Sequence, residues 1–166
     1  MEIPNQYLLT AKDLPFDEIC TKSVDAYREL CKAKYCRNMD LYTQANDHLL
    51  KAIEYDDKFA FAYRQLVFNG YSLNKPNDEL ETYSNMVLKT MHNVPDIYQR
   101  SSKIFHARHF EKDREKVMMI LEMDSKLNPD DLNIKALLGN MYYRNGEFDK
   151  YIELIENCYK IEPDSN

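Results

Sequence analysis

Two histidines and two cysteines have the types and spacing from which a metal site could be built. His106 and His109 lie three residues apart in a segment with helical periodicity, so both side chains can point to one side of a helix. Neither a Glu-x-x-His pair nor a nearby cysteine cluster completes a ligand set, so we expect solvated or groove-facing histidines. Cys31 and Cys36 lie five residues apart, and we interpret them as small core residues. The sequence therefore predicts neither a metal site nor a cofactor.

The composition argues against several classes of function. The 166 residues carry a formal net charge of −6, which disfavours a nucleic-acid surface or an anionic-membrane surface. Only three glycines are present, which disfavours a glycine-rich phosphate loop. The sequence shows neither a signal peptide nor a run long enough to span a membrane, and four cysteines without a C-x-x-C pair predict reduced thiols in a cytoplasmic protein. No Ser/His/Asp or Cys/His order stands out, so we do not expect an enzyme.

The spacing of apolar residues predicts helices along most of the chain. Residues 1–20 contain Pro4 and Pro15 and lack helical periodicity until their end, so we expect an N-terminal tail. Beyond it, apolar positions on one helical face recur in successive segments. These segments predict helices over 24–36, 41–55, 60–72, 78–91, 96–109 and 114–127, with a further pair within 130–163. The predicted fold class is all-α.

The last part of the chain contains a motif with a known spacing. Leu138 and Gly139 are adjacent, Tyr142 follows three residues later, and the turn 145–147 (Asn-Gly-Glu) comes next. Pro163 closes the segment. This order resembles the tetratricopeptide repeat, a helix–turn–helix unit of 34 residues. In such a unit Gly139 would admit the paired helix closely, and Gly146 would supply the left-handed residue that ends the first helix.

A second proline supports the repeat and two residues depart from it. Pro129 precedes Pro163 by 34 residues, and each follows a segment with helical periodicity. Lys135 stands where the family usually has Trp, and Tyr151 stands where it usually has Ala, so a neighbour must house the Tyr151 ring. A helical hairpin with a glycine turn but no repeat remains the alternative.

The resemblance implies a right-handed α-solenoid of about four antiparallel helix pairs, over residues 21–57, 58–94, 95–129 and 130–163. The order of the pieces also resembles repeat regions attached to bacterial transcriptional regulators, cyclases and kinases. This further resemblance rests on Leu14-Pro15, on Thr21 and Ser23, on Ala26-Tyr27, and on the segment 59–63 (Phe-Ala-Phe-Ala-Tyr).

In such a solenoid the first helix of each pair lines a concave face. Asn140 matches one element of the set with which some family members clamp a C-terminal carboxylate, but Arg64, Gln65 and Phe68 do not, so clamp binding is not predicted. Aromatic and cationic residues nevertheless alternate there, and they predict binding of an acidic or aromatic-bearing peptide. The predicted partner-binding residues are Arg28, Lys32, Tyr35, Phe61, Arg64, Phe68, Tyr71, Gln99, Ser102, His106, Asn133, Asn140, Tyr143 and Arg144. The alternative for each is packing against the neighbouring helix pair.

The final segment predicts a second interaction surface. Seven apolar or aromatic side chains cover about half the circumference of the helix after Glu147, and the chain as given ends five residues after Ile161. We therefore expect this edge to be covered by a second copy in a symmetric dimer, or else by another chain. The residues concerned are Tyr151, Ile152, Leu154, Ile155, Cys158, Tyr159 and Ile161, with Tyr151, Ile155 and Tyr159 at the contact.

The function that follows from these expectations is a non-catalytic protein–protein interaction module, the sensory or partner-binding part of a bacterial transcriptional or signalling regulator. A stand-alone scaffold or adaptor is the first alternative. A small-molecule-binding protein or an enzyme is the alternative from another class. No direct contact with nucleic acid or membrane is expected.

Overall fold

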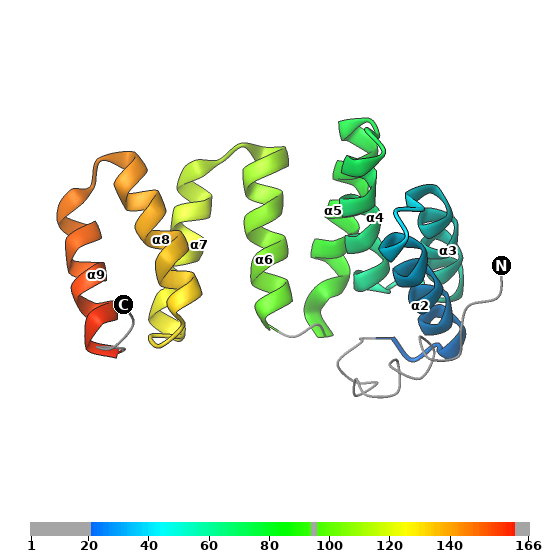
Figure 1. Ribbon diagram of the computed structural model, residues 1–166, viewed down its shortest axis with the longest axis horizontal. Coiled ribbons are helices and arrows are strands. Elements are labelled where there is room, and N and C mark those ends of the chain that lie inside the picture. The colour runs from blue at the N-terminus through cyan, green and yellow to red at the C-terminus, as the bar shows by residue number, and fades with distance from the viewer. Residues whose placement is uncertain (1–20, 94–95, 162–166) are drawn as a thin grey trace. The chain divides into compact units, whose positions relative to one another are not determined.

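A computed structural model describes residues 21–93 and 96–161 of the chain (Figure 1). Every regular element in these ranges is a helix, so the predicted all-α class is confirmed. The tail expected over residues 1–20, and the closing Pro163, lie outside the described residues. The chain divides into two compact units, the first ending at His106 and the second beginning at Ala107. This division falls inside the helix pair expected over residues 95–129.

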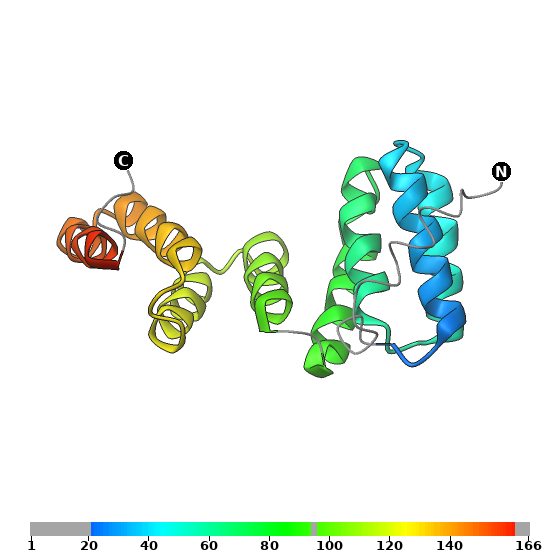
Figure 2. The ribbon, with the colours of Figure 1, turned by 60° about the horizontal axis from the view of Figure 1, so that its bottom comes forward.

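The first unit contains five α-helices in its described part, and helices that are consecutive in sequence pack against each other. Figures 1 and 2 show α2 beside α3, with α4 and α5 next to them. A 3-10 turn over Met91–Asn93 follows α5. The helices are α2 (Val24–Asn38), α3 (Tyr42–Tyr55), α4 (Ala60–Ser72), α5 (Asn77–Thr90) and α6 (Asp96–His106).

The core of the first unit lies between α2, α3 and α4. Ala45 and Ala52, which lie about two turns apart on α3, are fully buried and allow the neighbouring helices to approach. Phe59 is the largest fully buried side chain and leads into α4. Burial of this apolar surface is the main source of stability, at roughly 25 cal/mol per Å² removed from water.

Local signals explain several of the helix ends. Ser23 caps α2, with its Oγ accepting a hydrogen bond of 3.1 Å from the backbone N–H of Ala26. Helix α5 begins after Pro76 and has no side-chain capping hydrogen bond. Pro76 fits because proline fixes φ near the helical value and needs no hydrogen-bond partner for its nitrogen.

A glycine on α4 permits a close approach of α5. A Cβ placed on Gly70 would lie 2.1 Å from Cδ2 of Leu80 on α5, which is far inside van der Waals contact. At Gly139, where the sequence predicts a close approach, a Cβ would meet Leu154 and Tyr151 at ordinary distances of 3.4 and 3.5 Å. Packing therefore excludes a Cβ at position 70, whereas position 139 has room for one.

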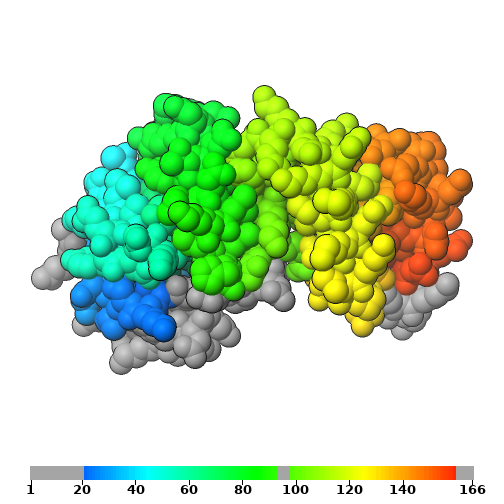
Figure 3. Space-filling view, turned by 180° about the vertical axis from the view of Figure 1, so that it is seen from behind, coloured from blue at the N-terminus to red at the C-terminus, as the bar shows by residue number. Residues whose placement is uncertain are grey.

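The second unit begins with a π-helical turn, η4 (Ala107–Glu111), followed by α7 (Arg114–Leu127), α8 (Leu132–Asn145) and α9 (Phe148–Ile161). The sequence predicts one helix from 96 to about 109, and the structure replaces its last turn by η4. Helix α8 contacts both α7 and α9. Figure 3 shows the surface of α7, in yellow, adjoining α8 and α9 in orange to red. Gly146 ends α8 in the left-handed conformation (φ 77°), as the sequence predicts.

The described residues were compared with what a membrane span and a metal site require. None of their helices is long and apolar enough to cross a membrane. No group of three or more His, Cys, Asp or Glu side chains in residues 21–93 and 96–161 is arranged to hold a metal ion.

Candidate functional site

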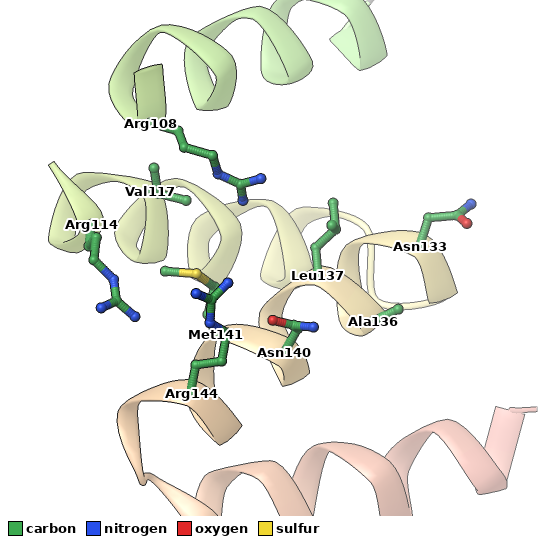
Figure 4. A pocket seen from close by; sticks show the side chains of 9 residues that line it. All are labelled: Arg108, Arg114, Val117, Asn133, Ala136, Leu137, Asn140, Met141 and Arg144. Atoms are coloured by element: carbon green, nitrogen blue, oxygen red, sulfur yellow. The ribbon is translucent and has the colours of Figure 1, made fainter. Parts of the chain in front are cut away.

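One face of α8 forms the long wall of a pocket in the second unit. The helix starts at the Asp131 cap, whose carboxylate accepts hydrogen bonds of 3.0 and 3.2 Å from the N–H groups of Asn133 and Ile134. The wall residues recur at intervals of three or four, the spacing of one helical face. They are Asn133, Ala136, Leu137, Asn140 and Arg144, and together with α7 and η4 they enclose a volume of about 750 Å³ (Figure 4).

Three arginines from three different elements border this pocket. Arg108 lies on η4, Arg114 is the first residue of α7, and Arg144 lies in the last turn of α8. Figure 4 shows their side chains around Val117 and Met141. The pocket therefore has a cationic end, while Asn133 and Ala136 lie toward the other end.

The arginines are held in different ways. Nη2 of Arg114 donates a hydrogen bond of 3.0 Å to Oδ1 of Asn145, which orients its guanidinium. Arg108 and Arg144 make no ion pair with any carboxylate in the described part of the chain. No Asp or Glu is among the residues that line the pocket. Two of the three guanidinium groups are thus available to an anionic ligand.

The pocket's charge contrasts with that of its surroundings. Residues 107–166 contain nine Lys and Arg against thirteen Asp and Glu, so this part of the chain has a net charge of −4. The three arginines are therefore a local positive region in an acidic unit. Val117 and Met141 form a buried apolar floor, whereas the three arginines are themselves exposed.

The chemistry of the lining groups is that of binding. Arginine stays protonated, and asparagine does not titrate, so neither group is suited to transferring a proton at neutral pH. Both supply N–H donors, and the guanidinium matches the paired oxygens of a carboxylate or phosphate. The arrangement can hold and orient an anion next to an apolar side chain.

The structure brings together three of the residues expected at the concave face and adds two that the sequence analysis missed. Asn133, Asn140 and Arg144 line the pocket, as their shared helical face predicts. Arg108 and Arg114 were not predicted. In the sequence, both residues lie near the turn 111–113 (Glu-Lys-Asp) between two helical segments, and this is the one feature that they share. The place where the first segment ends depends on η4, which the sequence does not predict.

The aromatic residues expected on α4 pack against α6 within the first unit. The ring of Phe61 lies 4.8 Å from that of Tyr98, and the Phe105 ring lies 5.2 Å from Phe68 and 5.9 Å from Tyr71, measured between centroids. These contacts favour the packing alternative for Phe61 and Phe68, whereas Tyr71 remains partly exposed.

Arg64 is also engaged inside the first unit. Its guanidinium carbon lies 4.7 Å from the centre of the Phe68 ring and 5.5 Å from that of Tyr98. Burial lowers the pKa of Arg64 from its ordinary value. Arg64 is thus a cation that stabilises the α4–α6 contact through the two rings.

The other expected groove residues of α2 and α6 are either ion-paired or at least half-buried. Arg28 pairs with Asp25, and Lys32 pairs with Glu29 on the same helix. Tyr35 and Ser102 are buried. Gln99 is half-buried.

One of the two histidines, His106, calls for a correction. His106 is buried, and its Nδ1 lies 2.9 Å from the Oγ of Ser84. It is therefore not solvated, because it is buried against α5. His109 belongs to the second unit.

The expected self-association edge on α9 is partly occupied by contacts within the second unit. The Tyr151 ring lies against Gly139 and 5.7 Å from the Tyr143 ring, and Tyr143 also contacts Phe148. Tyr151 and Ile155 are half-buried, while Tyr159 is 61% exposed. Dimerisation through this edge stays a prediction.

Comparison with known proteins adds no assignment to this geometry. The chain matches no protein-family model, and no curated protein sequence matches it significantly.

Proposed function

We propose that this protein is a non-catalytic protein–protein interaction module that holds an acidic segment of a partner protein in the arginine–asparagine pocket. The observation that carries the proposal is the pocket itself: three arginines, two of them without a carboxylate partner in the described residues, beside two asparagines and an apolar floor. Arginine is among the residues that most often contribute strongly to binding at protein interfaces.

The length of the pocket wall suits an extended peptide. Asn133 and Arg144 are eleven residues apart on α8, which corresponds to about 16 Å at a rise of 1.5 Å per residue. An extended chain advances about 3.3 Å per residue, so roughly five residues of a partner match this wall. Asparagine amides can donate to and accept from a peptide backbone, while the arginines select acidic side chains.

We further propose that the helices form a right-handed solenoid of tetratricopeptide-like helix pairs. The proposal is supported by the successive contacts of α2 with α3, α4 with α5 and α8 with α9, and by the left-handed Gly146 between α8 and α9. Pro129 just beyond the end of α7 also fits the resemblance.

The same resemblance supports a role as the sensory or partner-binding part of a bacterial transcriptional or signalling regulator, with a stand-alone scaffold as the alternative. A cytoplasmic location fits the free thiols of Cys31, Cys36 and Cys158. Sequencing the genomic flanks separates the two roles, since a regulator would carry an adjoining DNA-binding or kinase domain.

A small organic anion is the competing ligand class, because about 750 Å³ lies within the usual range of 300–1,000 Å³ for ligand pockets. The test uses a photo-reactive benzoylphenylalanine in place of Leu137, which lines the pocket and is 46% exposed. Irradiation of cells that express this variant should produce a covalent adduct with a partner protein.

The charge-reversal variants decide whether the adduct reports on the pocket. Arg108→Glu combined with Arg144→Glu should abolish the adduct, and Arg28→Glu, which changes an exposed arginine of the first unit, should leave it intact. An adduct that survives the double reversal would place the partner elsewhere. Absence of any protein adduct, together with a small molecule from cell extract that raises the melting temperature, would favour the small-molecule class.

A further inference from the structure

The cationic end of the pocket holds more positive charge than one carboxylate can neutralise. Arg108, Arg114 and Arg144 contribute three charges around one buried floor, and none of the residues lining the pocket is acidic. An aspartate or glutamate side chain brings one negative charge and two acceptor oxygens. A phosphorylated side chain brings about −1.5 to −2 at neutral pH and three acceptor oxygens.

We propose that the pocket recognises a phosphorylated serine or threonine within the bound segment of the partner protein. This inference rests on the proposed function, and it specifies the anion that the arginines select. Arginine rather than lysine stands at all three positions, and the planar guanidinium can give two parallel hydrogen bonds to a phosphate.

The support around the arginines also suits a phosphate. The hydrogen bond to Asn145 orders the Arg114 side chain in the free protein, so this side chain loses less conformational entropy when the ligand binds. The side chains come from η4, α7 and α8, so they border the pocket from three different elements. Asn140, on the turn of α8 before Arg144, can donate to a further oxygen or to the peptide backbone.

The apolar part of the pocket favours a phosphate that is carried on a peptide. Val117 and Met141 are buried beneath the arginines, and Ala136 and exposed Leu137 continue the apolar surface along α8. A free phosphate ion makes no use of this surface, whereas the flanking side chains of a peptide can. Nucleic acid is disfavoured by the net charge of −4 on residues 107–166, which would repel an extended polyanion.

The experiment compares three pools of nine-residue peptides with random flanks and a fixed centre of phosphoserine, serine or glutamate. The full chain should bind the phosphoserine pool at least about tenfold more tightly than either other pool. For a single peptide selected from that pool, Arg108→Gln and Arg144→Gln should each weaken binding about 10- to 100-fold, the range for hydrogen bonds between charged groups. Arg144→Lys should also weaken binding, because it keeps the charge and loses the two-pronged geometry.

Four controls test whether binding depends on the pocket and on the peptide. Arg28→Gln should bind the selected peptide as the wild type does, because Arg28 lies outside the pocket and pairs with Asp25. Inorganic phosphate should compete only weakly, and a single-stranded oligonucleotide should not compete at matched charge concentration. Circular dichroism of each variant should match the wild type, which shows that weaker binding does not reflect unfolding.

The contrary outcomes are distinct. Equal, arginine-dependent binding of the glutamate and phosphoserine pools would overturn phosphate recognition and leave the acidic-segment function standing. Binding of inorganic phosphate or of the oligonucleotide in preference to all three pools would overturn both. Phosphopeptide binding that is unaffected by Arg108→Gln and Arg144→Gln would show that the phosphate site lies elsewhere.

Discussion

The two helix glycines, Gly70 and Gly139, should respond differently to the same substitution. Both lie inside an α-helix, where replacing glycine by alanine stabilises the helix by about 0.5–1 kcal/mol because the unfolded chain loses conformational freedom. At Gly139 the new methyl group meets its neighbours at 3.4–3.5 Å, which is ordinary contact. Gly139→Ala should therefore raise the free energy of unfolding by up to about 1 kcal/mol.

At Gly70 the methyl group would lie 2.1 Å from Cδ2 of Leu80. Leu80 is only 2% exposed, so its side chain cannot swing into solvent, and relief requires a shift of α5 or an unfavourable rotamer. Overpacking of this kind costs about 1–3 kcal/mol. The helix-propensity gain offsets part of this cost, so Gly70→Ala should lower the free energy of unfolding by between zero and about 2.5 kcal/mol. The Gly70→Ala variant should therefore be about 1–3 kcal/mol less stable than the Gly139→Ala variant.

Urea unfolding followed by circular dichroism at 222 nm measures both variants against the wild type. A double-mutant cycle with Leu80→Ala tests the cause directly. Leu80→Ala alone should cost about 2–5 kcal/mol, and it should cost less in the Gly70→Ala background because the clash is removed with Cδ2. If Gly70→Ala stabilises as much as Gly139→Ala, or if the cycle shows no coupling, the close approach of α4 and α5 at this point is wrong.

Three further substitutions test individual polar contacts. Burial raises the pKa of Glu29, but its hydrogen bonds from Lys32 and His48 (2.7 Å) outweigh this and hold the pKa below the usual range. The stability that these contacts provide should be present above the unfolded carboxyl's pKa of about 4.3 and should be lost as the pH falls through the folded pKa. The difference in urea midpoint between the wild type and Glu29→Gln should therefore shrink as the pH is lowered. Tyr142→Phe removes a 2.9 Å hydrogen bond to Glu122 and should cost about 1–2 kcal/mol in urea unfolding, and an unchanged midpoint would show that water replaces the contact. Asp113→Ala removes the α7 cap and should cost about 1 kcal/mol, while Asp113→Asn should be nearly neutral because asparagine caps as well; equal losses in thermal unfolding would contradict a capping role.

The sequence predicts most of the local structure because helices are specified by nearby residues. The bounds expected for 60–72 and 114–127 agree with α4 and α7, since apolar periodicity, turns and capping residues all lie within the helix and its flanks. The same reasoning predicts that Gly146 ends α8. It also places Asn133, Asn140 and Arg144 on one face, because that depends only on the helical repeat.

Contacts between residues of different helices could not be predicted from the sequence. The crowded glycine is Gly70 because Leu80 packs against it, and nothing in the sequence near Gly70 shows that contact. Arg64 has the same residue type and helical spacing as a groove residue, yet the rings of Phe68 and Tyr98 enclose its guanidinium.

The pocket shows the same division. Its α8 wall follows from the helical repeat, whereas its cationic end exists only because η4 ends the preceding helical segment and α7 begins at Arg114, next to the last turn of α8. Helical periodicity describes one element at a time, and a site assembled from three elements is defined by their packing. The tertiary structure alone therefore determined that Arg108 and Arg114 join Arg144.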